Sequence, residues 1–496
     1  MLRAKVALFT SAALRSTSIG LRLMKEYGLA DGTRSVLRKT YGMRKAMDGV
    51  SSLISIWWAL TTTYVCLLNH QQIDRLTTPQ LFWDDDGQVY LSSTYRMRNR
   101  TPVPVGSKQL KDFAIHICKV DLRTGRSLTA PQLIRSSSSG VSEGSHIIKR
   151  GKYYYLFTAE GGTESGHSEY VSRSTTGPLG PWELGGKLVS SGVGVDDGVQ
   201  NTGHCDLIED DQGRWWAVLL AVRPRKTDDG AWETSVFGKS TMIHHMRLLT
   251  SHLLGRETFL IPVTWKDDWP VFNEEKQVTI AGKASGLYEH EHDPTWRDDF
   301  EDAAGMQLGW YRKSTPQVND WSLSERPGYL RLWGGPYVLS TPTCATMWLR
   351  KQTHRYITFE TKLGFRPKSK YTQAGVVVWW NCGCLSSMGI SVADDNVQQR
   401  VMKLRLADGT CHEVPLESST DEVVLTIRCG SKYEFGFSEV GVAVRWIGSV
   451  SNDIMTRDPE VGAPFTGMMI GLYAHGDLEP VLVPADFAYA KFEKAE

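Results

Sequence analysis

The sequence of 496 residues lacks an excess of charge of either sign and carries little that suggests a membrane span. Lys and Arg total 56 against 55 Asp and Glu, so the net charge is +1. A chain this close to neutral has no electrostatic signature of binding to nucleic acid or to an anionic membrane surface, and neither is predicted as a partner. An apolar stretch at 53–68 is shorter than the roughly 20 residues of a transmembrane helix. It also contains three threonines, so we predict a buried segment rather than a span.

Metal-binding and redox cysteine patterns are also missing. The eight cysteines include no CxxC pair, and Cys382-Gly383-Cys384 has no second pair with zinc-like spacing. We therefore predict no metal site and no cofactor, and the even number of cysteines does not establish disulfides in so long a chain. The sequence Glu289-His290-Glu291-His292-Asp293 would permit a metal site by spacing. We interpret residues 276–296 instead as a polar linker between domains.

The first 70 residues differ in texture from the rest of the chain. Residues 1–25 contain five basic residues and no acidic residue, which is typical of a presequence. A secretory signal fits less well, because the apolar stretch between Lys5 and Arg15 is short and interrupted. A mispredicted gene start is a third interpretation of this segment, and the one that we favour. The sequence therefore leaves the compartment open between cytoplasmic and secreted.

Helix-favouring runs are few, whereas glycine and aromatic strand patterns are frequent, which predicts an all-β protein. Three polar turns that contain Gly87, Gly151 and Gly213 are each followed by an aromatic strand. These glycines are 64 and 62 residues apart. A turn, a glycine and an aromatic strand that recur at near-constant spacing predict the blades of a β-propeller.

From Trp296 onward the pattern changes to short strands that are separated by turn signals, as in Tyr356–Thr361, Gly375–Trp380 and Val423–Arg428. This spacing predicts a sandwich of two antiparallel sheets. The predicted domains are an atypical segment at 1–70, a propeller at 71–275, the linker at 276–296 and a β-sandwich at 297–496.

The stretch 141–163 is the strongest candidate for a functional site. Glu143 lies between the small residues Ser142 and Gly144, close to His146, and an aromatic strand and a glycine-rich turn follow. A carboxylic acid at the mouth of a strand pair can donate a proton to a substrate. Taken alone, Glu143 fits a solvated surface residue as well.

A set of motifs in order changes the interpretation of that acid. Glu143-Gly144-Ser145-His146, Ala159–Thr163, His167, Thr202-Gly203-His204 and Leu254–Thr258 together resemble glycoside hydrolase family 43. The resemblance extends from about residue 76 to the C-terminus. It is closest to the β-xylosidase and α-L-arabinofuranosidase branch, which has a C-terminal concanavalin-like β-sandwich. It implies a five-bladed propeller, but only about 200 residues have the blade texture. We therefore expect an incomplete propeller whose first blade is missing or replaced.

The resemblance also implies roles for individual residues. Inverting hydrolysis needs a general acid and a general base on opposite faces of the sugar, and Glu143 matches the general acid. The aspartate that raises the pKa of this acid in the family is replaced by Thr78, just before the strand Pro79–Asp84. No stretch matches the general base, which stays unknown. The implied substrate-binding residues are Arg256, His204, His167, Thr163 and Phe465.

The resemblance therefore implies an inverting glycoside hydrolase that would act on xylo-oligosaccharides or arabinosides. With Thr78 uncharged and no base identified, we expect the chain as written to be inactive or nearly so. The alternatives are a pseudoenzyme that binds pentoses or xylan without cutting them, and a propeller scaffold that binds another protein. The sequence leaves self-association open.

Overall fold

The computed structural model describes residues 76–96, 113–163, 166–190, 199–223, 253–280, 293–302, 305–314, 319–417, 422–439, 442–456 and 465–495. The predictions for residues 1–70, including the apolar stretch 53–68, and for the spacing at 289–292 lie outside these residues. Among the residues described, no helix has the length and apolar character to span a membrane. The chain forms two compact units, and the first contains the described residues up to Arg223 and from Glu257 to Ile280.

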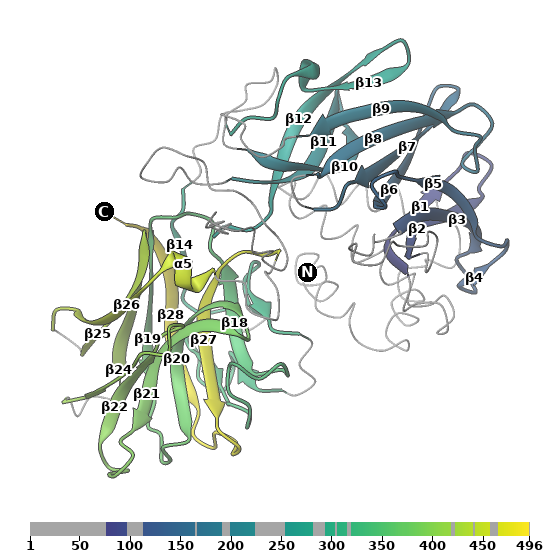
Figure 1. Ribbon diagram of the computed structural model, residues 1–496. Helices are drawn as coiled ribbons and strands as arrows, with labels where there is room; N and C mark the ends of the chain where they lie inside the picture. Colours follow the sequence, from purple (N-terminus) through teal and green to yellow (C-terminus); the bar gives the residue numbers. More distant parts are fainter. Residues whose placement is uncertain are drawn as a thin grey trace, which may run out of the picture. The chain divides into compact units, whose positions relative to one another are not determined.

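The first unit consists of antiparallel sheets that are the blades of a β-propeller (Figure 1). Each of its three described sheets begins with a hairpin that contains one of the repeated glycines, and Gly87, Gly151 and Gly213 all have a positive φ. The repeat that predicted blades is therefore confirmed. The first blade comprises β1 (Leu76–Trp83), β2 (Val89–Arg96), β3 (Phe113–Asp121), β4 (Arg126–Ser127) and β5 (Gln132–Ser136). The second blade comprises β6 (Ser142–Arg150), β7 (Tyr153–Glu160), β8 (Ser168–Ser174) and β9 (Glu183–Ser190). The third blade comprises β10 (Gln200–Glu209), β11 (Trp215–Val222), β12 (Glu257–Lys266) and β13 (Trp269–Phe272). The 3-10 turn η3 (Asn273–Glu275) follows β13.

Aromatic side chains on the second strand of the middle blade fill the space between blades. Tyr155 and Phe157 of β7 are fully buried. The Phe157 ring stacks on Phe272 of β13 at 6.3 Å between centroids. Because a pleated strand places alternate side chains on opposite faces, these two residues reach the same neighbouring blade. The aromatic strand that was predicted after Glu143 therefore packs blade against blade.

A polar link joins the first two blades at the hairpin of β1 and β2. Tyr154 Oη donates a hydrogen bond to the Asp84 carboxylate at 3.0 Å, and Lys149 Nζ lies 3.2 Å from the same carboxylate. Burial alone would raise the pKa of Asp84, but hydrogen bonds from the Asp85 N–H, Lys149 and Tyr154 outweigh burial and lower that pKa. The ionised carboxylate is therefore the form that holds the two blades together.

Replacing Asp84 with Asn is expected to lower the free energy of unfolding by about 1–3 kcal/mol at pH 7, since charged hydrogen bonds are lost at a partly buried site. A lowered pKa means that this stabilisation is present above the ordinary carboxyl range, near pH 4, and is lost as the pH falls through the folded pKa. The difference between wild type and Asp84→Asn should therefore shrink on acidification, as measured by chemical denaturation at several pH values. Asp85 contacts the same Lys149 with a side chain that is 83% exposed, so Asp85→Asn is the matched control and should change stability little. A difference that is independent of pH would contradict this account.

The second unit contains a β-sandwich of two antiparallel sheets (Figure 1). The two-sheet prediction from the strand spacing is confirmed. One described sheet comprises β14 (Trp296–Asp298), β16 (Trp321–Ser322), β17 (Leu330–Leu332), β19 (Ile357–Gly364), β24 (Glu422–Cys429), β25 (Lys432–Glu439), β26 (Arg445–Ser451) and β28 (Ala485–Lys494). The other comprises β15 (Tyr311–Arg312), β18 (Thr346–Lys351), β20 (Thr372–Asn381), β21 (Cys384–Val392), β22 (Arg400–Arg405), β23 (Cys411–Pro415) and β27 (Met469–Gly476). A short helix, α5 (Asn452–Met455), follows β26.

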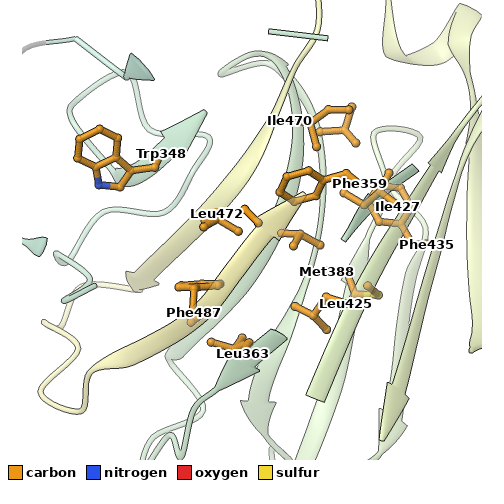
Figure 2. Packing of buried hydrophobic residues seen from close by; sticks show 14 of the residues in the cluster. Trp348, Phe359, Leu363, Met388, Leu425, Ile427, Phe435, Ile470, Leu472 and Phe487 are labelled. Atoms are coloured by element: carbon orange, nitrogen blue, oxygen red, sulfur yellow. The ribbon is translucent and has the colours of Figure 1, made fainter. Parts of the chain in front are cut away.

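The two sheets bury one apolar core between their facing surfaces (Figure 2). Along β19 every second residue is buried, so Phe359 and Leu363 point into the core. From the opposite sheet, Met388 of β21 and Leu472 of β27 are also fully buried. Alternating burial of this kind is what a strand with one face on a core produces.

A short segment that lies between β11 and β12 in sequence packs with the sandwich rather than with the propeller. Leu253 is buried in the sandwich core, and its carbonyl accepts a hydrogen bond from Met468 N–H at 2.8 Å. Gly255 has a positive φ and lies so close to Gly467 that a Cβ there would be 2.2 Å from the Gly467 nitrogen. Residues 253–256 are inside the range that we predicted for the propeller, and no local pattern indicated that they pack with the sandwich.

Candidate active site

The same β-bulge occurs on the first strand of each described blade. Pairing between β1 and β2 shifts between Thr77 and Gln80. The corresponding shift on β6 lies between Glu143 and His146, and on β10 between Gly203 and Asp206. In each case one extra residue is inserted on the first strand, and bulges of this kind re-aim side chains near active sites. The strand β6 lies against both β1 and β10, so the three bulges are neighbours.

The backbone is left-handed at the equivalent position of every bulge. Thr78, Gly144 and His204 have φ values of 45°, 57° and 54°. Glycine adopts this conformation freely, whereas a β-branched residue such as threonine is strained in it. Strained residues of this type concentrate at functional sites. The three bulges therefore mark the part of the propeller where function is most expected.

Thr78 contacts the backbone of the β6 bulge, next to the predicted general acid. Its hydroxyl accepts a hydrogen bond from Gly144 N–H at 3.1 Å and lies 2.7 Å from the Thr94 hydroxyl on β2. Gly144 directly follows Glu143, whose side chain is half-buried. The residue predicted at the pKa-modulating position therefore does lie next to the acid's backbone, but it offers a neutral hydroxyl there.

His204 lies against the other side of the same glycine. A Cβ built on Gly144 would be 2.5 Å from His204 Nε2, so the imidazole occupies the space that any other residue would fill. The His204 and His146 rings are 6.2 Å apart. His146 Nδ1 lies 3.4 Å from Asp206 Oδ1, which connects the second blade to the third. The β6 bulge beside Glu143 is therefore enclosed by Thr78 on one side and by His204 on the other.

His167 and Thr163 lie around the turn between β7 and β8. His167 is only 2% exposed, and its Nδ1 is 2.8 Å from the Asn201 carbonyl oxygen. A Cβ on Gly203 would meet the His167 ring at 2.9 Å, so this ring packs beneath the residue that precedes His204. Thr163 is half-buried in the turn after β7. Because His167 is buried, its position suits a residue that supports the β10 bulge better than one that contacts a sugar directly.

The remaining two predicted residues, Arg256 and Phe465, contact each other in the second unit. The Arg256 guanidinium lies 4.0 Å from the centroid of the Phe465 ring, and Arg256 N–H donates a hydrogen bond to the Phe465 carbonyl at 3.0 Å. Lys351 Nζ donates to the Arg256 carbonyl at 2.7 Å. Phe465 is 47% exposed. The guanidinium and the ring therefore form one cation–aromatic pair with an exposed face.

Replacing Gly144 with Ala is expected to displace the His204 ring and to reduce any activity of this site by about ten-fold or more, because small misplacements at a reacting centre are costly. Gly151 is the matched control: its φ of 58° is nearly the same, and a Cβ there meets nothing within 4 Å. Gly144→Ala and Gly151→Ala thus carry the same backbone strain and differ in the clash with His204. Ligand affinity and activity measured on both variants should separate them. Equal losses would show that strain rather than the clash is responsible.

Several residues of this site were not predicted from the sequence. They are Thr94, Asn201 and Asp206, together with the buried ion pair of Arg135 Nη2 and Glu160 Oε1 at 2.7 Å. One signal was present: Thr78 and His204 each lie nine positions before a repeated turn glycine. Gly144 lies seven positions before its glycine because that turn is shorter. Counting back from the turns could have aligned two of the three bulges.

The fold and the bulged strands define the class of protein: a β-propeller followed in sequence by a two-sheet β-sandwich, an architecture found in glycoside hydrolases. Residues 57–270 match the model of "Glycosyl hydrolases family 43". Residues 297–493 match the "Beta xylosidase C-terminal Concanavalin A-like domain". The chain belongs to glycoside hydrolase family 43.

Similar proteins come from several bacteria. A non-reducing end alpha-L-arabinofuranosidase of Bacteroides ovatus is 33% identical over 390 residues, which cover 75% of this chain and 66% of that protein. A xylan 1,3-beta-xylosidase of Vibrio is 29% identical and covers 84% of this chain and 75% of that protein. Among solved structures, the family 43 xyloglucan-locus protein of Bacteroides ovatus has a TM-score of 0.67 at 30% identity, with 84% of this chain and 76% of that one covered. The xylan beta-1,4-xylosidase of Bacillus halodurans has a TM-score of 0.70 at 25% identity and covers 86% and 77%. The chain thus spans just under two thirds of the length of the first of these relatives and about three quarters of the others.

Proposed function

We propose that this protein is a glycoside hydrolase that removes xylosyl or arabinofuranosyl residues from xylan-type or arabinoside substrates. The observation that carries the proposal is the enclosure of the β6 bulge beside Glu143: the Thr78 hydroxyl and the His204 imidazole both contact Gly144. The names of the relatives, an arabinofuranosidase and a xylosidase, support the two substrate classes.

In this proposal Glu143 is the general acid that protonates the leaving-group oxygen as the glycosidic bond breaks. Inversion also needs a base that takes a proton from the attacking water, with the two carboxyl groups roughly 6.5–9.5 Å apart. We assign no residue to the base. His204 would orient the sugar beside Glu143, with His167 supporting it from below. Arg256 and Phe465 are proposed sugar contacts, the guanidinium for hydroxyl groups and the ring for a sugar face.

Thr78 should make the enzyme slow. A neighbouring negative charge raises the pKa of a catalytic acid and keeps it protonated near neutral pH. The Thr78 hydroxyl cannot supply that charge. We therefore expect weak turnover even where the substrate binds well.

The test is hydrolysis of aryl β-D-xyloside and aryl α-L-arabinofuranoside, with aryl β-D-glucoside as the control substrate. Slow release of the aryl group from one or both pentosides, but not from the glucoside, is the expected result. Millimolar binding of xylose or xylobiose without any hydrolysis would instead favour a pentose-binding pseudoenzyme. Absence of both binding and hydrolysis would refute the proposal.

A further inference from the structure

A buried carboxyl on β8 has no role in the chemistry described above. The side chain of Glu169 is 0% exposed, and among the described residues no cation forms an ion pair with it. Its Oε2 accepts a hydrogen bond from Cys205 N–H at 3.0 Å. Its Oε1 has no hydrogen-bond partner in the described part of the chain. Burial of such a group lowers the stability of the fold, so its presence at this position indicates a specific role.

The position of Glu169 connects it to the histidine of the proposed site. A bulge removes backbone N–H groups from the regular ladder, and on β10 the affected residues are His204 and Cys205. Glu169 Oε2 accepts the hydrogen bond from Cys205 N–H, the residue directly after His204, and the His204 backbone N–H is close enough to lower the pKa of Glu169. The bulge on β6 is secured in the same manner, since Gly144 N–H donates to the Thr78 hydroxyl. Each of these two bulges is thus fixed by a side chain from the preceding blade.

We propose that Glu169 is a positioning residue: acting from the second blade, it holds the left-handed backbone at His204 so that the imidazole lies against Gly144, beside Glu143. The role in catalysis rests on the proposed function, while the positioning of His204 stands on the geometry. Glu169 itself touches no substrate.

The surroundings of Glu169 favour the neutral form. Burial raises the pKa of Glu169 well above its ordinary value, and the charge of Glu160 on β7 adds to this rise, while the N–H groups of Cys205 and His204 oppose it. Glu160 is itself paired with Arg135 from the first blade, and the buried thiol of Cys205 faces Glu169 from β10. The pKa of Glu169 is higher in the folded than in the unfolded protein, so protonated Glu169 stabilises the fold. This stabilisation is fully present below the ordinary carboxyl range and is lost as the pH rises through the folded pKa.

The experiment compares Glu169→Ala and Glu169→Gln with wild type in the full chain. Asp298→Asn is the matched control. Asp298 is also a buried carboxyl, which accepts a backbone N–H from Phe300 at 3.0 Å, but it lies in the sandwich. The readouts are the His204 imidazole NMR signal, assigned with His204→Asn, the melting temperature as a function of pH, and kcat and KM on the aryl pentosides.

We expect Glu169→Ala to move the His204 signal and to lower kcat/KM by about ten-fold or more, as small misplacements do. Glu169→Gln, which has the shape of the neutral acid, should leave the His204 signal and kcat/KM near wild type. In wild type the melting temperature should fall as the pH rises through the folded pKa of Glu169, and Glu169→Gln should abolish this fall. Asp298→Asn should leave the His204 signal in place. If Glu169→Ala does not fold, the His204 signal of Glu169→Gln and the pH dependence of its melting temperature still test the proposal.

Two results would overturn the proposal: an unchanged His204 signal in Glu169→Ala, or a displaced His204 signal in Glu169→Gln. Failure of the proposed function would appear differently, because wild type itself would then neither hydrolyse nor bind pentosides. The His204 signal and the pH dependence of melting would still test the positioning role in that case.

Discussion

Replacing Glu143 with Gln is expected to lower hydrolysis of unactivated pentosides by about 10²–10⁴-fold, the usual contribution of a general acid. The amide keeps the shape of the carboxyl but cannot deliver a proton to the leaving oxygen. Substrate affinity should change little, so the loss should appear in kcat. Steady-state kinetics on phenyl and dinitrophenyl xylosides measure this directly.

The choice of leaving group makes the Glu143 test specific. A dinitrophenolate leaves without protonation, so its release should fall far less than that of phenol. Glu183 on β9 is the matched control, since it is a glutamate of the same blade that pairs with Arg173 at 2.8 Å on the outer strand. Glu183→Gln should leave both rates near wild type. An equal loss for both leaving groups in Glu143→Gln would contradict the role of Glu143 as the acid.

Replacing Thr78 with Asp is expected to raise kcat by about ten-fold or more, since one unit of pKa shift in the acid corresponds to a ten-fold change in its protonated fraction above the pKa. The new carboxylate would lie where the hydroxyl now accepts Gly144 N–H. Its negative charge should raise the pKa of Glu143. The alkaline limb of the pH–rate profile should therefore move to higher pH than in wild type.

The backbone at position 78 provides the control for that variant. At a φ of 45°, Thr is strained, whereas Asp and Asn are among the residues that tolerate left-handed conformations. Thr78→Asn therefore relieves the same strain as Thr78→Asp without adding charge. Only the aspartate should raise kcat and move the alkaline limb. An equal gain in Thr78→Asn would show that strain, not charge, limits the rate.

The fold was largely predictable because strand periodicity and turn chemistry are local properties. The turn glycines Gly87, Gly151 and Gly213 each need a positive φ, so their spacing revealed the blades. The turn signals around Tyr356–Thr361 likewise predicted a short strand, which the structure shows as β19. Neither pattern depends on which distant segment packs against it.

The candidate site was predictable only in part. The ordered motifs identified Glu143, His204 and Thr78 as candidates, and the structure brings these three around Gly144. Arg256 and Phe465 were also singled out, and they contact each other, although nothing in the sequence indicated that residues 253–256 pack with the sandwich. Glu169 was not identified at all, because an acid in a strand pattern looks like any solvated residue.

The sequence by itself determined the blade repeat and the sandwich and singled out Glu143 as the candidate acid, since each follows from short-range pattern or motif. Only the tertiary structure decided where the bulges fall and which residue of one blade fixes the backbone of the next. Those choices depend on hydrogen bonds between strands that are far apart in the chain, such as Glu169 with Cys205 and Thr78 with Gly144. A contact of that kind has no signature in either segment alone, because each partner is an ordinary polar residue until folding buries the two together.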